Sequence, residues 1–149
     1  MHATLTAVTA FLPVIASIAH AGEVFWAEAE EYSDQHGSVG ADRPPFGSRG
    51  ACLGASWGGA RDHYVLYRFR IDHAVSDARL QLRYARRDSG DALWTVILDG
   101  KTVAERLALK STGGWGHLAD REWAYQEIPL GDRPPGAHWL RLVSRAEEN

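Results

Sequence analysis

Apolar and polar side chains alternate along most of the chain after residue 60. Across residues 63–71, apolar side chains occupy every second position and arginines fall between them. Residues 78–86 repeat the alternation, with leucines and a tyrosine set against arginines and a glutamine. Successive side chains of a β-strand point to opposite faces, so this period predicts strands with one face on a core and one in water.

Turn signals between shorter apolar runs indicate further strands. Asp99-Gly100 is a favoured two-residue hairpin turn, and apolar runs flank it on both sides. A Pro-Pro-Gly run at 134–136 marks a second turn. The predicted strands are 24–30, 63–71, 78–86, 93–98, 102–107, 123–130 and 137–143.

The pattern favours an all-β fold. No stretch shows a long helical period of 3.6 residues with capping residues at its ends. Many short strands separated by glycine and proline turns are typical of an antiparallel β-sandwich. Residues 32–59 are glycine-rich and lack a clear period, and a segment of that length in a compact domain is usually functional or partly strand.

The first 21 residues have the features of a signal peptide. An apolar run spans 5–19, and Ala19-His20-Ala21 is a small-x-small cleavage site. The run is too short and too rich in alanine and threonine to predict a membrane span. Residues 1–21 carry no Lys or Arg, so either the true start lies elsewhere or the signal is atypical. We expect a secreted or periplasmic protein whose mature part, residues 22–149, is one domain.

Charge and cysteine content narrow the possible partners. The formal net charge of -3 gives no electrostatic reason to bind nucleic acid or an anionic membrane. Cys52 is the only cysteine, so no disulfide forms within the chain. We expect Cys52 to be a small buried residue and not a nucleophile, because no base lies at a recognisable spacing. We expect a monomer that binds neither nucleic acid nor a membrane.

Two tryptophans lie in glycine-rich segments that cannot shield them. Trp57 lies within 54–59, and Trp115 lies within 112–116. A large ring in such a loop is expected to keep a face open to solvent, and exposed flat apolar faces are typical of recognition sites. Sugars have flat C–H faces, so the two loops together suggest a sugar-binding site. The alternative is that each ring folds inward and closes one end of the core.

Several motifs, taken in order, resemble carbohydrate-binding modules of families 6 and 35, which are β-sandwiches of the jelly-roll type. Each motif alone is short, but together they span nearly all of residues 22–149. The matching segments are EAEEYS at 28–33, GGARDHYV at 58–65, LRYA at 82–85, VILDGK at 96–101, TGGW at 112–115 and PGAHWLRL at 135–142.

The resemblance implies a ligand site in loops at one end of the sandwich, where a sugar lies between Trp57 and Trp115. It also implies a polar side chain from the loop before the last strand, and Asn149 is the nearest match. The family's last strand would follow this position, whereas the sequence ends at Asn149. Either the sequence belongs to a longer chain, or the jelly roll lacks its last strand and exposes the edge of a neighbouring strand.

The resemblance further implies a structural calcium ion held by a Glu-x-Glu motif on the first strand, which Glu28 and Glu30 match. Side chains at i and i+2 of a strand point to the same face, and Ca²⁺ prefers oxygen ligands. Backbone carbonyls from 48–50 would add to the coordination, and the family's final aspartate ligand would lie beyond Asn149. The alternative is a pair of solvated glutamates on an edge strand.

Polar loop residues would supply hydrogen bonds to the sugar hydroxyls. Asp62 and His117, with Arg61 and Asp120, lie close in sequence to the two tryptophans, although His117 fits an ordinary surface residue better. We therefore expect non-catalytic binding of a polysaccharide or oligosaccharide.

No catalytic constellation is evident from the sequence. The seven histidines show no metal-ligand spacing, and no carboxylate pair is fixed at the separation that glycoside hydrolysis requires. No serine lies in a nucleophile elbow. We therefore expect no enzyme activity. The alternative function is a secreted structural or protein-interaction sandwich, with the tryptophans buried against a partner.

Overall fold

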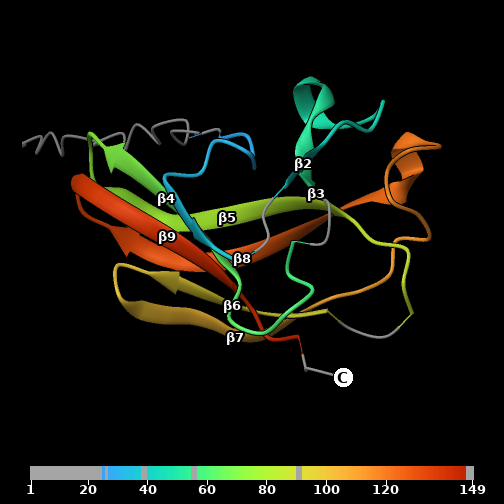
Figure 1. The fold of residues 1–149 in the computed structure, drawn as a ribbon. Coiled ribbons are helices and arrows are strands. Elements are labelled where there is room, and N and C mark those ends of the chain that lie inside the picture. Colours follow the sequence, from blue (N-terminus) through green and yellow to red (C-terminus); the bar gives the residue numbers. More distant parts are fainter. Residues whose placement is uncertain (1–24, 26, 38–39, 55–56, 90–91, 147–149) are drawn as a thin grey trace, which may run out of the picture.

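The part of the chain that the structure describes folds into β-strands with two short 3-10 turns (Figure 1). The computed structural model describes residues 25, 27–37, 40–54, 57–89 and 92–146. The strands are β1 (Asp34–His36), β2 (Gly40–Asp42), β3 (Cys52–Gly54), β4 (Tyr64–Ile71), β5 (Val75–Ala85), β6 (Ala92–Leu98), β7 (Lys101–Leu109), β8 (Trp123–Arg133) and β9 (Gly136–Ser144). The turns are η1 (Ser48–Gly50) and η2 (Asp120–Glu122).

All strand pairs are antiparallel. Five strands form one sheet in the order β1-β4-β9-β6-β7, whereas β5 pairs with β8 and β2 pairs with β3. The chain crosses from the five-stranded sheet to the β5–β8 pair and back twice, so only β6 and β7 are neighbours both in this sheet and in sequence (Figure 1). The prediction of an all-β, antiparallel sandwich of jelly-roll type is confirmed.

The core forms where the two layers face each other. Its centre consists of six buried apolar side chains from four strands, namely Val65, Val96, Leu98, Ile128, Leu140 and Leu142. Those of β6 and of β9 lie two residues apart, which is the period of one face of a strand. Leu80 and Leu82 of β5 pack against this cluster, as the alternation in 78–86 predicts.

The predicted strand at 24–30 is wrong for the residues that the structure describes. Those residues lie in no strand, and the carbonyl of Glu28 accepts a hydrogen bond from the N–H of Glu31 at 3.0 Å, which closes a turn. The chain meets the five-stranded sheet only afterwards, where the N–H of Ser33 donates to the carbonyl of Leu66 at 2.7 Å and β1 then pairs with β4. The edge of β4 is therefore taken by the segment after the turn.

Two predictions concern the ends of the chain, namely the signal peptide and the role of Asn149. The predicted signal peptide, residues 1–21, and Asn149 both lie outside the described residues. Within the described ranges, no helix is long and apolar enough to cross a membrane.

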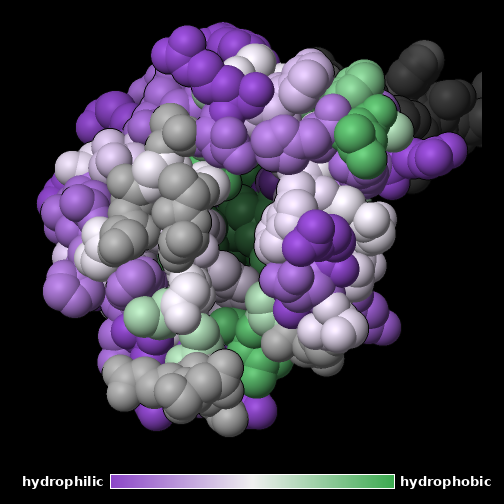
Figure 2. Space-filling model, turned by 45° about the vertical axis from the view of Figure 1, so that its right-hand side comes forward, coloured by the Kyte–Doolittle hydropathy of each residue, from purple (hydrophilic) through white to green (hydrophobic). Residues whose placement is uncertain are grey.

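The two-stranded β5–β8 sheet has an open edge on each of its strands in the described part of the chain. In the described part of the chain β5 has a single strand partner, β8, which leaves its other edge unpaired. The register of this pair shifts twice between Val75 and Arg79, and Asp77 between them has a φ of 52°. Figure 2 shows a hollow in the surface with apolar residues in its depth.

A buried histidine and an aspartate join the β6–β7 hairpin to β9. The predicted turn at Asp99-Gly100 has φ values of 49° and 81°, as a two-residue hairpin turn requires. Asp99 Oδ2 lies 2.7 Å from His138 Nδ1, and Asp99 Oδ1 accepts the backbone N–H of Trp139 at 3.0 Å. His138 Nε2 lies 2.9 Å from the carbonyl of Pro134. Both ring nitrogens therefore face acceptors, which favours the protonated imidazolium.

The pKa values of the two side chains shift in opposite directions. The hydrogen bond that His138 donates to Asp99 raises the pKa of His138 above its ordinary value, against the opposing effect of burial. Burial acts to raise the pKa of Asp99, but the hydrogen bonds from His138 and Trp139 outweigh it and lower that pKa. Each shift stabilises the charged form, so the pair adds stability where both groups are charged.

We expect this pair to make stability depend on pH within a defined window. The contribution of His138 is full below 6.5 and is lost as the pH rises through its raised pKa. The contribution of Asp99 is full above 3.8 and is lost as the pH falls through its lowered pKa. The gain in the free energy of unfolding is therefore greatest between pH 3.8 and 6.5.

Asp99→Asn tests this window, because asparagine accepts a positive φ but carries no charge. At about pH 5.5 the variant should lose about 1.5 kcal/mol, the low end for a charge-assisted hydrogen bond, because Asp99 is 33% exposed. As the pH rises through the raised pKa of His138, the loss should shrink, since the wild-type imidazole then loses its charge. Urea unfolding across this pH range measures the difference. Parallel pH profiles for the two proteins would contradict the assignment.

Candidate functional site

Trp115 lies in the loop between β7 and β8, and hydrogen bonds fix the base of that loop. The N–H of Thr112 donates to the carbonyl of Arg86 at 2.7 Å, and the N–H of Arg86 donates to Thr112 Oγ1 at 2.8 Å. Ser111 Oγ donates to the carbonyl of Arg87 at 2.9 Å. These bonds join the loop to the chain that leaves β5, so Trp115 is presented from an anchored base.

The Trp115 ring borders a surface cavity of about 230 Å³. The lining residues are Arg87, Gly113, Gly114, Trp115, His117, Leu118 and Glu122. Trp115 is 43% exposed and Leu118 is 85% exposed, so apolar surface is open to solvent here. The guanidinium carbon of Arg87 lies over the Trp115 ring, 5.9 Å from its centroid. The cavity thus combines an aromatic platform with charged groups at its rim.

His117 connects this cavity to the β2–β3 hairpin. His117 Nε2 lies 3.3 Å from Asp42 Oδ2, and both side chains are about half exposed. In Figure 1 the hairpin and the loop before β8 project from the same side of the sandwich. Glu122 supports the loop from within, where its Oε2 accepts the N–H of Leu118 at 3.3 Å. His117 and Trp115 therefore line the same cavity.

Trp57 has a different environment. Its ring lies 4.5 Å from that of Trp94, with an interplanar angle of 33°, and it packs against the hydrophobic core. Trp94 is only 9% exposed, and the indole Nε1 of Trp57 is buried without a hydrogen-bond partner in the described part of the protein. The ring contact of Trp57 is thus with Trp94 and not with Trp115. This is the inward-folded arrangement that the sequence leaves open.

Asp62 lies apart from the Trp115 cavity. It is exposed, has a φ of 63°, and donates its N–H to the carbonyl of Ser144 at 3.0 Å. The structure therefore gives Asp62 a role in tying the loop before β4 to the end of β9. Asn149 lies outside the described residues, so its predicted role stays a prediction.

Glu28 and Glu30 lie near η1, although not on a strand. Glu28 is 5% exposed, its Oε1 accepts a hydrogen bond from Ser48 Oγ at 3.2 Å, and Arg49 Nε lies 3.3 Å from the same oxygen. Glu30 Oε2 is buried and has no hydrogen-bond partner in the described residues. Burial, followed by the charge of Glu30, raises the pKa of Tyr67. A buried carboxylate oxygen without a donor is the kind of group that a cation would satisfy.

A metal centre made of side chains alone is absent from the described ranges. No group of three or more histidine, cysteine, aspartate or glutamate side chains there could hold a metal ion. Any calcium held by Glu28 and Glu30 would need backbone carbonyls such as those of 48–50.

Cys52 lacks the environment of a catalytic thiol. It is partly buried, and burial, followed by the charges of Asp42 and Glu30, raises its pKa to about 11. The thiol is therefore protonated near neutral pH, when it is a poor nucleophile.

Sequence reasoning missed Arg87, Leu118 and Glu122 as cavity residues. Arg87 reaches the cavity because the segments that follow β5 and β7 are hydrogen-bonded to each other through Arg86 and Thr112, a contact that no local pattern reveals. Leu118 carried one signal, since it is an apolar residue within a polar and glycine-rich loop.

Comparisons with known proteins add evidence on the fold. No protein-family profile matches the chain, and no curated protein matches it. A family 35 carbohydrate-binding module from Clostridium thermocellum matches with a TM-score of 0.65 and 18% identity, covering 81% of this chain and 85% of that one. A family 35 module from Paenibacillus barcinonensis matches with a TM-score of 0.60 and 20% identity, covering 83% and 89%.

A family 6 module from Clostridium cellulolyticum, solved in complex with xylose, also matches. Its TM-score is 0.58 at 20% identity, with 82% of this chain and 85% of that chain covered. The chain therefore has the fold of carbohydrate-binding modules of families 35 and 6. The predicted resemblance is confirmed at the level of the fold.

The two tryptophans should differ in their effect on stability. Trp57→Ala removes a ring packed on Trp94 and the core, so we expect the free energy of unfolding to fall by about 2–4 kcal/mol. Trp115→Ala removes an exposed ring and one cation–π contact, so the loss should stay below about 1 kcal/mol. Urea unfolding of both variants measures this. Equal losses would show that Trp115 is also a core residue.

Proposed function

We propose that this chain is a non-catalytic carbohydrate-binding module that uses Trp115 as its sugar platform. The observation that supports this most directly is a large exposed ring bordering a cavity, on a fold shared with carbohydrate-binding modules. Stacking the C–H face of a pyranose on the indole would remove that apolar face from water. The sugar hydroxyls would not have to contact an apolar surface. The neighbour from Clostridium cellulolyticum holds xylose, which is a sugar of this kind.

The rim of the cavity would recognise the sugar hydroxyls. Arg87 and His117 supply nitrogen donors, and Glu122 supplies a carboxylate acceptor. A shallow site with one platform would bind a single sugar weakly, at about -4 kcal/mol or roughly millimolar affinity. A polymer that offers many such units would be retained more strongly.

The second wall of the predicted clamp stays a prediction. Trp57 is packed on Trp94, and Asn149 lies outside the described residues. A role for Asp62 in hydrogen bonding likewise stays a prediction.

Two observations support a binding role over catalysis. Asp120 and Glu127 are engaged in separate ion pairs, Asp120 with Arg83 at 2.8 Å and Glu127 with Arg79, and so form no carboxylate pair for hydrolysis. Cys52 has the raised pKa of a buried thiol. Export, inferred from residues 1–21, would bring the module to glycans outside the cytoplasm.

We also propose that Glu28 and Glu30 hold a structural calcium ion. The buried, unpartnered Glu30 Oε2 supports the assignment, and backbone carbonyls of 48–50 would complete an oxygen shell. Bound calcium would neutralise the two carboxylates and hold η1 against the segment that precedes β1.

The platform is tested by replacing Trp115 with alanine. Trp115→Ala should weaken retention on affinity gels that contain xylan or soluble cellulose derivatives by at least about tenfold. Phe46→Ala is a matched control, because Phe46 is 39% exposed and does not line the cavity. Equal retention of wild type and Trp115→Ala on every neutral glycan that the wild type binds would reject the platform. No retention of the wild type on any glycan would favour a protein-interaction module.

The calcium site is tested by its effect on melting. With calcium at about 100 times its Kd, removal by EDTA should cost about 2.7 kcal/mol, or roughly 10 °C in Tm. Glu30→Gln should melt at the same temperature with and without EDTA, because it removes the carboxylate that binds the ion. A wild-type Tm that is unchanged by excess EDTA would rule out calcium at this site.

A further inference from the structure

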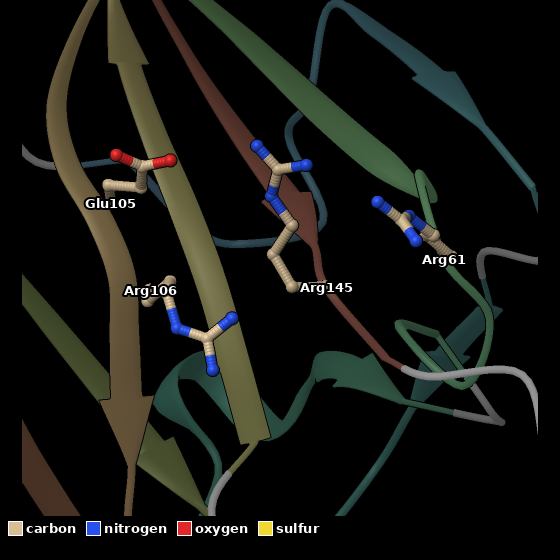
Figure 3. A pocket seen from close by; sticks show the side chains of 4 residues that line it. All are labelled: Arg61, Glu105, Arg106 and Arg145. Atoms are coloured by element: carbon tan, nitrogen blue, oxygen red, sulfur yellow. The ribbon is translucent and has the colours of Figure 1, made fainter.

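A second cavity of about 240 Å³ lies on the five-stranded sheet, away from Trp115. Its lining residues are Arg61, Glu105, Arg106 and Arg145 (Figure 3). Three guanidinium groups and one carboxylate give this arginine cavity a formal charge of +2, in a chain whose net charge is -3. The sign of the charge is thus locally reversed.

A β-bulge directs two of these side chains to the cavity. Trp94 pairs with Leu107 and Val96 pairs with Ala104, so Glu105 and Arg106 together lie opposite Thr95 alone. Arg106 has a φ of 55°, a left-handed conformation that is uncommon for a residue other than glycine. Bulges break the alternation of a strand and redirect side chains. Two consecutive residues of β7 therefore line one cavity.

Arg145 is held in place by β6. Its N–H donates to the carbonyl of Leu93 at 2.8 Å, and its Nε donates to Thr95 Oγ1 at 2.7 Å. Thr95 lies between the inward-facing Trp94 and Val96, so its side chain is on the outer face of the sheet. It is nevertheless only 1% exposed. With Nε engaged, the two terminal nitrogens of Arg145 remain available to a ligand.

The loop before β4 brings Arg61 to the same place. Asp62 N–H donates to the carbonyl of Ser144 at 3.0 Å, and Ser144 N–H donates to the carbonyl of His63 at 2.8 Å. Ser144 Oγ donates to the carbonyl of Gly58 at 2.7 Å. Three hydrogen bonds to one residue tie this loop to the end of β9. Figure 3 shows Arg61 on this loop facing Arg145 across the cavity.

The charges of this cavity are unbalanced within the described part of the protein. Other arginines form ion pairs, such as Arg70 with Asp72 and Arg83 with Asp120. No ion pair joins any of the four cavity residues to a described partner. Like charges repel, and an oxyanion that accepts from several guanidinium groups would relieve the repulsion through strong, charge-assisted hydrogen bonds.

We propose that the arginine cavity binds the carboxylate or sulfate group of an acidic saccharide. The inference rests on the proposed carbohydrate-binding function and adds a second, charged site to it. Glu105 would accept a hydrogen bond from a hydroxyl next to the acidic group, which suits a sugar better than a simple anion. Binding of a nucleic acid would require a long stripe of basic residues on the protein that follows the phosphate backbone. This cavity is compact, and the chain is acidic overall.

The test combines two cavity substitutions with a matched control. Arg61→Gln/Arg106→Gln removes two charges and leaves Arg145 in place on Thr95. Arg70→Gln removes an exposed arginine of β4 that does not line the cavity. Each protein is titrated with polygalacturonate, with a sulfated galactan, and with a neutral xylan or cellulose derivative that the wild type binds.

The wild type should bind at least one of the two acidic polymers, and the double variant should bind it at least tenfold more weakly. Arg70→Gln should match the wild type, and neutral-glycan binding should be unchanged in the double variant. The acidic polymer that binds identifies the group as a carboxylate or a sulfate.

Two results would overturn this proposal. They are no binding of either acidic polymer, and equal binding of the acidic polymer by the wild type and the double variant. In each case Trp115→Ala still tests the neutral site separately. Suppose that Trp115→Ala loses binding of the neutral glycan and that one of these results is also found. The proposed carbohydrate-binding function would then stand, and only the acidic site would be rejected.

Discussion

The two-sided pairing of β9 is the constraint on which the rest of the structure depends. β9 hydrogen-bonds with β4 on one side and with β6 on the other, and it places four alternate side chains toward the interior. Leu140 and Leu142 join the core, His138 holds the β6–β7 hairpin, and Ser144 ties down the loop before β4. One strand thus connects core packing to the loops that shape the arginine cavity, so a shift in its register would disturb all of them.

Much of this fold was predictable because it depends on local patterns. The strands at 63–71, 78–86, 93–98 and 137–143 were placed within a few residues, since alternation records which face meets the core. The Asp99-Gly100 turn was predictable for the same reason. The stretch at 24–30 begins with an apolar run that also favours a strand, but the turn that Glu28 closes with Glu31 prevails over that pattern. The short strands β1, β2 and β3 carry too few residues to leave a period.

The sites were less predictable, because they depend on contacts between distant segments. The exposure of Trp115 followed from its glycine neighbours, and the same reasoning failed to anticipate that Trp57 would meet Trp94. Thr95, Arg106 and Arg145 come together through a bulge and a side-chain hydrogen bond, neither of which has a sequence signature here. Sequence analysis locates exposed rings better than it locates clustered charges, since a charged residue is ordinary on any strand.

The unpaired edge of β5 has a consequence for behaviour in solution. A free strand edge offers a row of backbone donors and acceptors to which another chain can add. On β5 that row is interrupted near Asp77, whose φ is positive, and charged side chains such as Arg79 stand on its exposed face. An irregular, charged edge would make poor contact with a second copy of itself. The unpaired edge of β5 therefore carries less risk of fibre growth when the protein is concentrated.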